Sequence, residues 1–396
     1  MKTFMLIAGE PSGDLLAAEL VSALRELWPE AKFIGAGGPE MAAAGMELAF
    51  DMRDHAIVGI PTPGKLLALR YLSGELRSLA VAQRADAVIG VDYGGFNLRF
   101  GHTIRNYARA HPKLDWAPRL VQFVSPQVWA SRPGRAKLLE SDYDLLLSIF
   151  PFEKEWYARH APKLRVEFVG HPMVDRMQKN SAAIADLPDS AANSPAQVQS
   201  RPAAIEKPGP RLLLLPGSRK SELKHHLPIM TGALKIIRGK MPSATAMMVL
   251  PNEEMKQLAT SIAQCDLEVR AGNLPEALAR ADLAITKTGT VTMECAYFGA
   301  PAVTLYKKPL LGLAIALGIV TVKSLTMPNL MAGEEVYPEF IQAAATPENV
   351  ASAAMALLQN ESRRQGIKSR LAKIIASLGG PGATRRAAMA IAGLFE

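Results

Sequence analysis

The stretch Phe4–Asp14, FMLIAGEPSGD, decides how this chain is expected to fold. Its first five residues are apolar and indicate a buried strand, and the segment Asp14–Leu27 has the periodicity of a helix. A strand that enters a helix through a turn with two glycines begins a βαβ unit. The sequence therefore predicts an α/β fold that starts with this strand.

The alternation of apolar runs and helical segments continues along the chain. A helix is expected to open over Met41–Gly45, and a long helix is expected over Pro63–Arg84. The other expected strands share a short apolar run; they are Lys32–Gly35, Ala87–Val91, Leu120–Val124, Leu145–Phe150, Arg211–Leu215, Ala246–Leu250, Leu267–Arg270, Leu283–Thr286 and Ala302–Tyr306. Strands that alternate with helices predict mostly parallel sheets.

A segment between Asn180 and Pro210 divides this pattern into two halves. It is rich in Ala, Ser and Pro and has little periodicity, which is typical of a linker or a surface insertion. We expect an N-terminal Rossmann-like domain over residues 1–178, a linker over 179–210 and a second Rossmann-like domain over 211–345. Helices over 346–396 are expected to pack back toward the first domain. Two such domains are expected to face a central cleft, where ligands bind beyond the carboxyl ends of the strands.

Composition and charge restrict the class of protein. The chain has 396 residues, 49% of them hydrophobic, which excludes a disordered or fibrous protein. Its 45 Lys and Arg against 37 Asp and Glu give a net charge of +8, which favours an anionic partner such as nucleic acid, a phosphorylated substrate or an acidic membrane. The two cysteines, Cys265 and Cys295, form no CxxC motif and indicate a reducing compartment. The longest apolar run, Leu310–Val322, is shorter than the roughly 20 residues of a membrane span; it suits either a membrane surface or a buried helix.

Three turns that follow strands contain candidate ligand-binding residues. In the first turn these are Gly9, Ser12, Gly13 and Asp14, where the alternative is a helix cap. The second is the PGSR turn after Arg211–Leu215, in which Ser218 and Arg219 suit a phosphate. The third turn offers Thr288, Gly289 and Thr290 for a diphosphate and Glu294 for ribose hydroxyls, with a capped helix start again as the alternative.

Other polar residues carry weaker signals. Asn329 lies in the loop Met327–Gly333, and His171 follows a strand that ends near Phe168. Asp142 and Asp144 match a DxD metal pattern, but they also suit an ordinary entry into a strand. His225 and His226 lie in a charged segment, and we expect both to be solvated. No other cluster of His, Cys or carboxylates has the spacing of a metal site.

In their order along the chain these motifs resemble the family of lipid-A-disaccharide synthases, which are GT-B glycosyltransferases. The matching pieces are Ala8–Asp14 (AGEPSGD), Gly35–Met41 (GAGGPEM), Gly90–Asn97 (GVDYGGFN), Val124–Arg135 (VSPQVWASRPGR), Phe150–Lys154 (FPFEK), Phe168–Pro172 (FVGHP), Leu214–Arg219 (LLPGSR), Thr288–Glu294 (TGTVTME) and Pro328–Gly333 (PNLMAG). Nine pieces in the right order make chance similarity improbable.

The resemblance implies a reaction and its participants. It is an inverting transfer of 2,3-diacylglucosamine from its UDP donor to 2,3-diacylglucosamine 1-phosphate, in lipid A and lipopolysaccharide biosynthesis. The second domain is expected to hold UDP, with Ser218, Arg219 and the turn Thr288–Thr290 at the diphosphate, Glu294 at the ribose and Asn329 near the phosphates. The acceptor side is expected to include Ser125, Trp129 and His171. The resemblance implies no metal and no cofactor.

The chain departs from the family pattern mainly in its first half. Gly95 stands where the family has a second Asp, a favoured candidate for the general base, and Gly59–Pro63 lacks the usual Glu. A Trp-Ala-Trp motif reads Trp129-Ala130-Ser131, and a Ser or Ala that usually precedes the Gly-Thr turn is replaced by Lys287-Thr288. The remaining candidates for the base are Asp92, which we favour, Glu10 and Asp14.

Acyl substrates imply contact with a membrane. On the expected helix after Pro63, the residues Leu66, Leu67, Leu69 and Arg70 suit an anionic interface, with a buried amphipathic face as the alternative. The resemblance implies a protein on the cytoplasmic face of the inner membrane and allows a homodimer; no nucleic acid is expected. Competing hypotheses are a UDP-sugar transferase with another lipid acceptor, a non-catalytic paralogue that binds UDP-sugar or lipid, and a UDP-sugar 2-epimerase.

Overall fold

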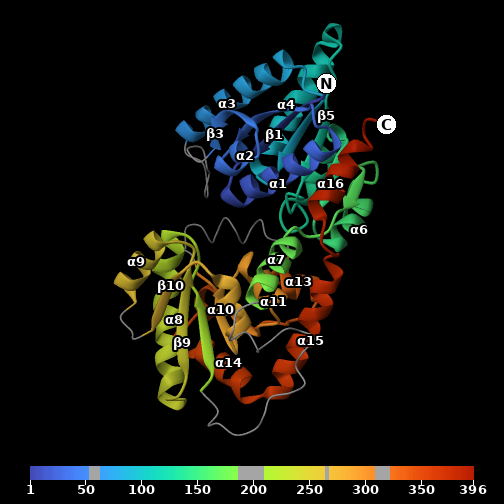
Figure 1. Ribbon diagram of the computed structural model, residues 1–396. Helices are drawn as coiled ribbons and strands as arrows, with labels where there is room; N and C mark the ends of the chain where they lie inside the picture. The colour runs from blue at the N-terminus through green and yellow to red at the C-terminus, as the bar shows by residue number, and fades with distance from the viewer. Residues whose placement is uncertain (53–62, 186–208, 264–266, 308–321) are drawn as a thin grey trace. The chain divides into compact units, whose positions relative to one another are not determined.

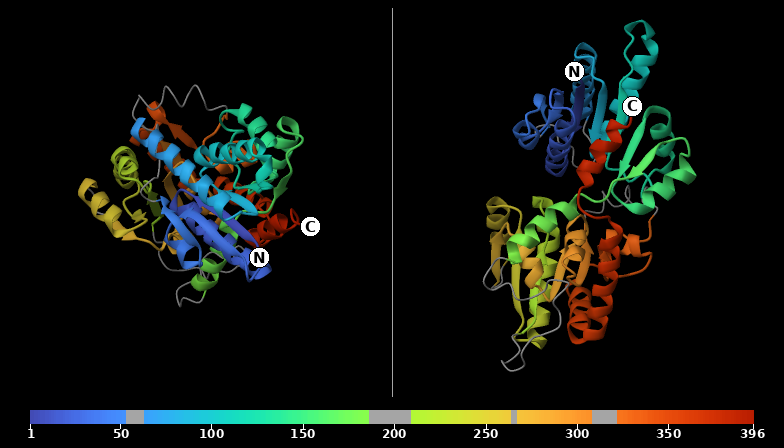
Figure 2. Two further views of the ribbon diagram at one scale, coloured as in Figure 1. Left: turned by 90° about the horizontal axis from the view of Figure 1, so that it is seen from above. Right: turned by 45° about the vertical axis from the view of Figure 1, so that its right-hand side comes forward.

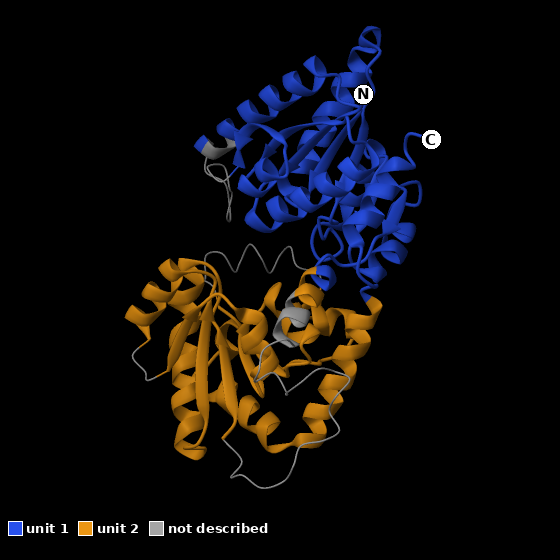
Figure 3. Cartoon of the chain, in the orientation of Figure 1, with its two compact units in different colours: residues 1–175, 378–396 blue, residues 176–377 orange. Residues whose placement is uncertain are grey.

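The computed structural model describes residues 1–52, 63–185, 209–263, 267–307 and 322–396. They form two compact units, drawn in different colours in Figure 3: unit 1 contains residues 1–175 and 378–396, and unit 2 contains residues 176–377. Each unit has its own parallel β-sheet with helices, so the predicted α/β class is confirmed.

Unit 1 contains a seven-stranded parallel sheet in the order β3-β2-β1-β4-β5-β6-β7. Every residue of the central strands β1 and β4 is buried, because helices cover both faces of a parallel sheet. The elements are β1 Thr3–Ala8, α1 Pro11–Leu27, β2 Lys32–Gly37, α2 Pro39–Ala43, β3 Glu47–Asp51, α3 Pro63–Ala82, β4 Ala87–Val91, α4 Gly94–Ala110, β5 Arg119–Phe123, α5 Ala136–Asp142, β6 Leu145–Ser148, α6 Pro151–His160, β7 Val166–Phe168, α7 Met173–Ala185 and α16 Ala383–Ala392, with short 3-10 helices η2 Pro112–Leu114 and η3 Pro133–Arg135. Helix α7 continues from unit 1 into unit 2.

The last helix of the chain completes unit 1. Helix α16 packs on α1, so both chain ends lie on unit 1 (Figures 1 and 2). The Phe395 ring meets Phe4 and Trp28 with ring centroids 6.1 and 6.0 Å apart. The Arg386 guanidinium donates to the carbonyl oxygens of Val169, Gly380 and Pro381, each at 2.7 Å. This end of the chain is therefore held by both ring packing and charged hydrogen bonds.

Unit 2 contains a six-stranded parallel sheet in the order β10-β9-β8-β11-β12-β13. Strand β8 follows the pattern expected of a buried strand, with four consecutive leucines that are all buried. The elements are β8 Arg211–Leu215, α8 Lys220–Lys240, β9 Thr245–Leu250, α9 Glu253–Ile262, β10 Glu268–Ala271, α10 Leu274–Arg280, β11 Leu283–Lys287, α11 Val291–Tyr297, β12 Ala302–Tyr306, α13 Met327–Ala332, β13 Glu339–Ile341, η4 Gln342–Ala344, α14 Pro347–Gln359 and α15 Glu361–Ser377.

The observed division differs from the expected domain boundaries at the C-terminal helices. Helix α14 packs against α8, and α15 packs against α11 and α13, so both belong to unit 2. Only residues 378–396 return to unit 1. The apolar faces of α14 and α15 are thus covered within unit 2.

The described residues include no helix that is both long and apolar enough to cross a membrane. Of the apolar run Leu310–Val322, residues 310–321 lie outside the described residues, and the same holds for Gly59–Thr62 and Cys265.

Candidate functional site

A pocket of about 440 Å³ opens in unit 2 at the carboxyl ends of four neighbouring strands. Its lining comes from the turns after β8, β9, β10 and β11 and comprises Leu215, Gly217, Ser218, Val249, Leu250, Pro251, Gly272, Asn273, Leu274, Pro275, Lys287, Thr290, Val291 and Glu294. This is the edge of a parallel sheet at which nucleotides bind in doubly wound folds. Four residues predicted for the donor or beside it, Ser218, Lys287, Thr290 and Glu294, meet in this pocket.

The PGSR turn is held by a carboxylate that the sequence motifs did not reveal. Glu222 accepts from the Ser218 N–H at 2.9 Å and from Lys287 Nζ at 3.2 Å, which ties the turn after β8 to the end of β11. Burial alone would raise the pKa of Glu222, but the Lys287 ammonium and the Ser218 N–H hold it below its ordinary value. Gly217 has φ +127°, and a side chain there would meet the Glu222 carboxylate. Arg219 is half exposed beside the same group, with Nη1 3.8 Å from Glu222 Oε1.

The turn after β11 contributes only part of its predicted residues to the pocket. Thr290 and Glu294 line the pocket, whereas Thr288 is buried and donates its N–H to the Leu305 carbonyl at 3.0 Å. Gly289 has φ +141°, a backbone conformation that favours glycine. Burial raises the pKa of Glu294, and the charge of Arg176 opposes that shift. A carboxylate with reduced solvation at a pocket wall suits hydrogen bonds from ligand hydroxyls.

Two polar residues that the sequence analysis singled out in unit 2 are buried and hydrogen-bonded within the fold. Asn329 is only 2% exposed, and its Oδ1 accepts from the N–H groups of Val336 and Tyr337 at 2.9 and 2.8 Å. Its Nδ2 donates to the Tyr337 carbonyl, so the amide holds its own loop. His226 is buried and not solvated: Nδ1 lies 2.8 Å from the Pro216 carbonyl, and Nε2 accepts from the Lys307 N–H at 3.2 Å.

In unit 1, the turn from β4 to α4 presents Asp92. Asp92 and Tyr93 have φ values of +51° and +44°, which are rare for residues other than glycine and are typical of strained functional turns. Two buried amides hold this turn, because Asn97 Nδ2 and Gln122 Nε2 each donate to the Asp92 carbonyl at 2.9 Å. Burial raises the pKa of the Asp92 carboxyl, and the nearby charge of Glu10 raises it further.

Position 95, where the expected second carboxylate is missing, has space for a side chain. Gly95 is exposed in the first turn of α4, and a Cβ added there meets no atom of the described residues within 4 Å. Gly9 is different, because a Cβ there would overlap the Tyr93 ring. Gly9 therefore leaves room for the Tyr93 ring, which belongs to the turn of Asp92.

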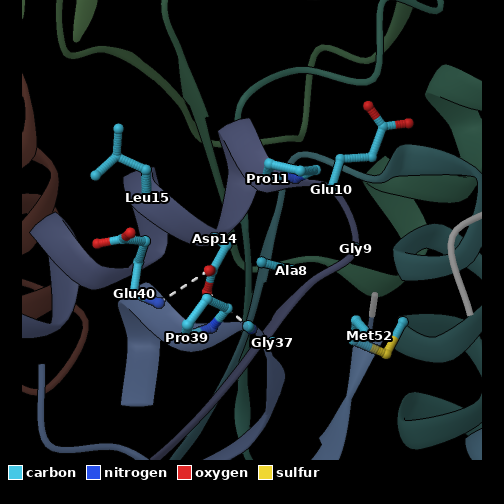
Figure 4. A pocket seen from close by; sticks show the side chains of 11 residues that line it. Ala8, Gly9, Glu10, Pro11, Asp14, Leu15, Gly37, Pro39, Glu40 and Met52 are labelled. Carbon is cyan, nitrogen blue, oxygen red and sulfur yellow. Dashed lines mark hydrogen bonds between the residues drawn. The ribbon is translucent and has the colours of Figure 1, made fainter. Parts of the chain in front are cut away.

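A pocket of about 330 Å³ adjoins the first turn of the chain (Figure 4). Its lining includes Gly9, Glu10 and Met52 and is mostly apolar. Figure 4 shows the Asp14 carboxylate turned toward the backbone of Glu40. Asp14 accepts from the N–H groups of Gly38, Glu40 and Met41 at 2.8, 3.0 and 3.1 Å, so it caps α2. Its carboxylate is therefore used within the fold. Of the other two predicted residues in this turn, Gly13 is buried and Ser12 is exposed at the start of α1.

The three predicted acceptor-side residues are buried and hydrogen-bonded within unit 1. Ser125 Oγ lies 3.0 Å from the Tyr157 hydroxyl, and Trp129 Nε1 donates to Glu153 Oε1 at 2.9 Å. His171 Nδ1 accepts from the Met173 N–H at 3.1 Å, at the start of α7. Burial raises the pKa of Glu153 to about 7, although hydrogen bonds from Trp129, Ser125 and the backbone oppose the shift.

The predicted membrane residues occupy α3. Leu67 is 70% exposed and Tyr71 is 68% exposed, one helical turn apart, with Arg70 exposed between them. Leu69 instead packs against the core of unit 1. The side chain of Leu66 lies outside the described residues.

Within the described part of the chain, no group of three or more His, Cys, Asp or Glu is placed to hold a metal ion. The two carboxylates of the DxD pattern have other partners. Asp142 Oδ2 lies 2.7 Å from His102 Nδ1, and Asp144 Oδ2 accepts from Arg105 Nη2 at 2.6 Å.

Comparison with protein families matches residues 4–392 to the family described as lipid-A-disaccharide synthetase. Curated relatives named lipid-A-disaccharide synthase match over nearly the full length. The protein of Syntrophus aciditrophicus is 32% identical over 98% of this chain and 96% of its own, and that of Alkalilimnicola ehrlichii is 33% identical over 98% of each chain. These matches confirm the resemblance carried by the motifs.

Solved structures with the same fold include MurG of Acinetobacter baumannii, with a TM-score of 0.56 and 15% identity over 99% of this chain and 100% of the other. The UDP-GlcNAc 2-epimerase of Neisseria meningitidis, bound to UDP-GlcNAc, has a TM-score of 0.59 and 10% identity over 100% of both chains. HepE of Anabaena, in complex with UDP and glucose, has a TM-score of 0.52 and 14% identity over 100% of this chain and 99% of the other. At these identities the likeness concerns the fold alone, and it confirms two Rossmann-like domains of the GT-B type.

Proposed function

The chain belongs to the lipid-A-disaccharide synthase family, and from that membership we propose that it is an inverting glycosyltransferase that makes the lipid A disaccharide. It transfers 2,3-diacylglucosamine from UDP to the 6-hydroxyl of 2,3-diacylglucosamine 1-phosphate. The products are the β-1′,6 disaccharide 1-phosphate and UDP. The observation that carries this proposal is the match over residues 4–392, which includes both units.

The pocket of unit 2 is the proposed donor site. Its position at the carboxyl ends of β8, β9, β10 and β11 suits a nucleotide, and Ser218, Thr290 and Lys287 offer donors to a diphosphate. Glu294 suits the ribose hydroxyls. Arg219 is exposed beside this turn and supplies a second positive charge. We propose that these cations, and not a metal ion, offset the negative charge that develops on UDP as it leaves.

The proposed base is Asp92. The acceptor hydroxyl gives its proton to the Asp92 carboxylate while its oxygen forms the new C–O bond. The bond between the donor sugar and UDP breaks at the same time, and its electron pair stays on the phosphate oxygen of UDP. Partial burial and the charge of Glu10 make Asp92 a stronger base than an ordinary aspartate. The bonds from Asn97 and Gln122 to its carbonyl fix the turn from which it acts.

The proposed membrane contact is the exposed face of α3. Leu67 and Tyr71 present apolar surface beside the charge of Arg70, a combination that suits an anionic interface. The proposal places the protein on the cytoplasmic face of the inner membrane, where both diacyl substrates would be held. Light scattering of the purified protein tests the homodimer that the family implies.

One assay tests the reaction. Purified protein is incubated with UDP-2,3-diacylglucosamine and 2,3-diacylglucosamine 1-phosphate, and the disaccharide is followed by mass. We expect product from the natural protein and a loss of at least about 100-fold in turnover for Asp92→Asn, the lower range for removal of a general base. UDP affinity should be unchanged in that variant. A protein that binds UDP but forms no disaccharide contradicts the proposal, and turnover of UDP-GlcNAc without lipid would identify an epimerase instead.

A further inference from the structure

Three arginines of unit 1 gather at one place outside the groups assigned so far. Arg99 lies on α4, Arg132 precedes the 3-10 helix η3, and Arg135 ends it. Burial lowers the pKa of the Arg135 guanidinium, and the positive charges of Arg132 and Arg99 lower it further. The geometry agrees, because the Arg135 N–H donates to the Arg132 carbonyl at 3.0 Å within one turn, and both η3 and α4 pack against α5.

Nothing within the described residues neutralises this cluster. None of its three guanidinium groups forms an ion pair with a described Asp or Glu, whereas Arg105 and Arg109 on the same helix both pair with acidic residues. Like charges gathered without a counterion cost free energy, and they are typical of sites that take an anion.

The backbone at Arg132 adds a second, independent cost. Arg132 has φ +59°, a left-handed conformation that is rare for a residue with a long side chain, and Pro133 follows it. Strain of this kind persists where the surroundings hold a side chain in a particular direction.

The cluster lies next to the proposed base. Arg99 is four residues after Gly95 on α4, so positions 95 and 99 lie on one face of the helix. Arg132 and Arg135 follow the loop after β5, and β5 pairs with β4, which carries Asp92 at its end. The three arginines thus belong to the helix and the loop that follow β4 and β5, and β4 leads into the turn of Asp92.

We propose that Arg99, Arg132 and Arg135 bind the phosphomonoester of the sugar acceptor. This inference rests on the proposed function and deepens it by assigning a phosphate site in unit 1. Guanidinium groups form paired hydrogen bonds with phosphate oxygens, and three of them more than offset the charge of a dianion. Bound there, the phosphate orients the sugar so that its 6-hydroxyl points back toward Asp92.

The first test compares Arg99→Gln and Arg132→Gln with a matched control, Arg119→Gln. Arg119 is exposed at the opposite end of β5. We expect the KM for 2,3-diacylglucosamine 1-phosphate to rise about tenfold or more in each cluster variant, the loss expected for one charged hydrogen bond. The KM for the UDP donor should be unchanged in the cluster variants. Both KM values should be unchanged in the control variant. An unchanged acceptor KM, or an equal rise with an acceptor that lacks the phosphate, overturns the proposal.

A binding readout separates this proposal from the proposed function. Arginines are modified with phenylglyoxal and mapped by mass, with the phosphorylated acceptor, the dephosphorylated acceptor, inorganic phosphate or phosphatidylglycerol vesicles present. Protection of Arg99, Arg132 and Arg135 by the phosphorylated acceptor, and not by its dephosphorylated form, supports the site even if no disaccharide forms. Protection by vesicles alone would assign the cluster to lipid headgroups and would overturn the proposal. Protection by inorganic phosphate alone would show a general anion site, and this outcome would also overturn it.

Discussion

Asp92 and Glu10 are two carboxylates close enough for one to alter the proton affinity of the other. Removing the charge of Glu10 in Glu10→Gln should lower the raised pKa of Asp92. Because the proposed base acts in its deprotonated form, the acid limb of the kcat profile should move to lower pH. The profile of turnover against pH measures this shift, with Glu26→Gln at the exposed far end of α1 as the control. If the acid limb of the profile does not move, the group that titrates in this profile is not Asp92.

Gly95 offers a second test of the base. The space at this position admits an Asp, and a carboxylate in the first turn of α4 is favoured by the helix dipole. We expect Gly95→Asp, introduced into the Asp92→Asn variant, to fold. Its turnover should be at least about tenfold higher than that of Asp92→Asn alone, which is within the range that a positioned base contributes. Gly95→Asn in the same background is the control, because it fills the space without a basic group. Equal rescue by both variants would show an effect of shape and not of proton transfer.

Arg219 tests the donor site. Its guanidinium is half exposed beside the PGSR turn, where Glu222 already pairs with Lys287. We expect Arg219→Ala to raise the dissociation constant of UDP about tenfold, the loss of one charged hydrogen bond. Calorimetric titration with UDP measures it, and Lys235→Ala, on an exposed part of the same helix, is the control. If the two variants bind UDP with equal affinity, Arg219 does not belong to the donor site.

At the scale of elements, the exposed face of α3 makes the membrane contact testable. Replacing both Leu67 and Tyr71 with Gln removes two large exposed side chains without touching the core. We expect the fraction that sediments with phosphatidylglycerol vesicles to fall severalfold, because apolar contact and anionic attraction act together. Met389→Gln, which changes a 58% exposed side chain on α16, is the control. Undiminished sedimentation would exclude this face.

The strands that the sequence could predict are those with an apolar run. Strand β8 contains four consecutive leucines and is predicted in full, whereas β3 over Glu47–Asp51 has no buried residue and only a short apolar segment between two acidic residues. Strand β13 is only three residues long and was also missed. Both β3 and β13 lie at the edge of a sheet, where a strand is less buried, so the apolar run that predicts a central strand is absent.

The site residues divide in a similar way. Turns after strands were predictable, since the fold brings Ser218, Thr290 and Glu294 to one pocket. The sequence could not distinguish a polar side chain that meets a ligand from one that bonds its own backbone, as Asn329 does. It also gave no sign of Glu222, because that bond joins segments 65 residues apart.

At the scale of the whole molecule, the two units should respond to pH in opposite directions. Glu153 in unit 1 has a folded pKa of about 7 against an ordinary 4.5, so its contribution is favourable at low pH and is lost as pH rises from 4.5 to 7. His226 in unit 2 has a lowered pKa, so its contribution is present above 6.5 and is lost as pH falls below that value. Each effect is at most about 1.4 kcal/mol per pH unit.

Calorimetric unfolding at pH 5 and pH 8 measures these contributions as differences between variants. Glu153→Gln should remove part of the pH dependence of unit 1, and His226→Gln should remove part of that of unit 2. His225→Gln is the control for the second change, because His225 is one residue away and is only partly buried. Variants whose pH dependence equals that of the natural protein would contradict these assignments.

The return of α16 to unit 1 has a consequence for the order in which a ribosome delivers the protein. Residues 1–175 leave the ribosome first, then the whole of unit 2, and only afterwards the residues 378–396 that complete unit 1. Until then Phe4 and Trp28 lack the Phe395 ring that packs on them. Unit 2 is one uninterrupted segment and has all its parts earlier. The half of the molecule that is synthesised first is therefore the half that is finished last.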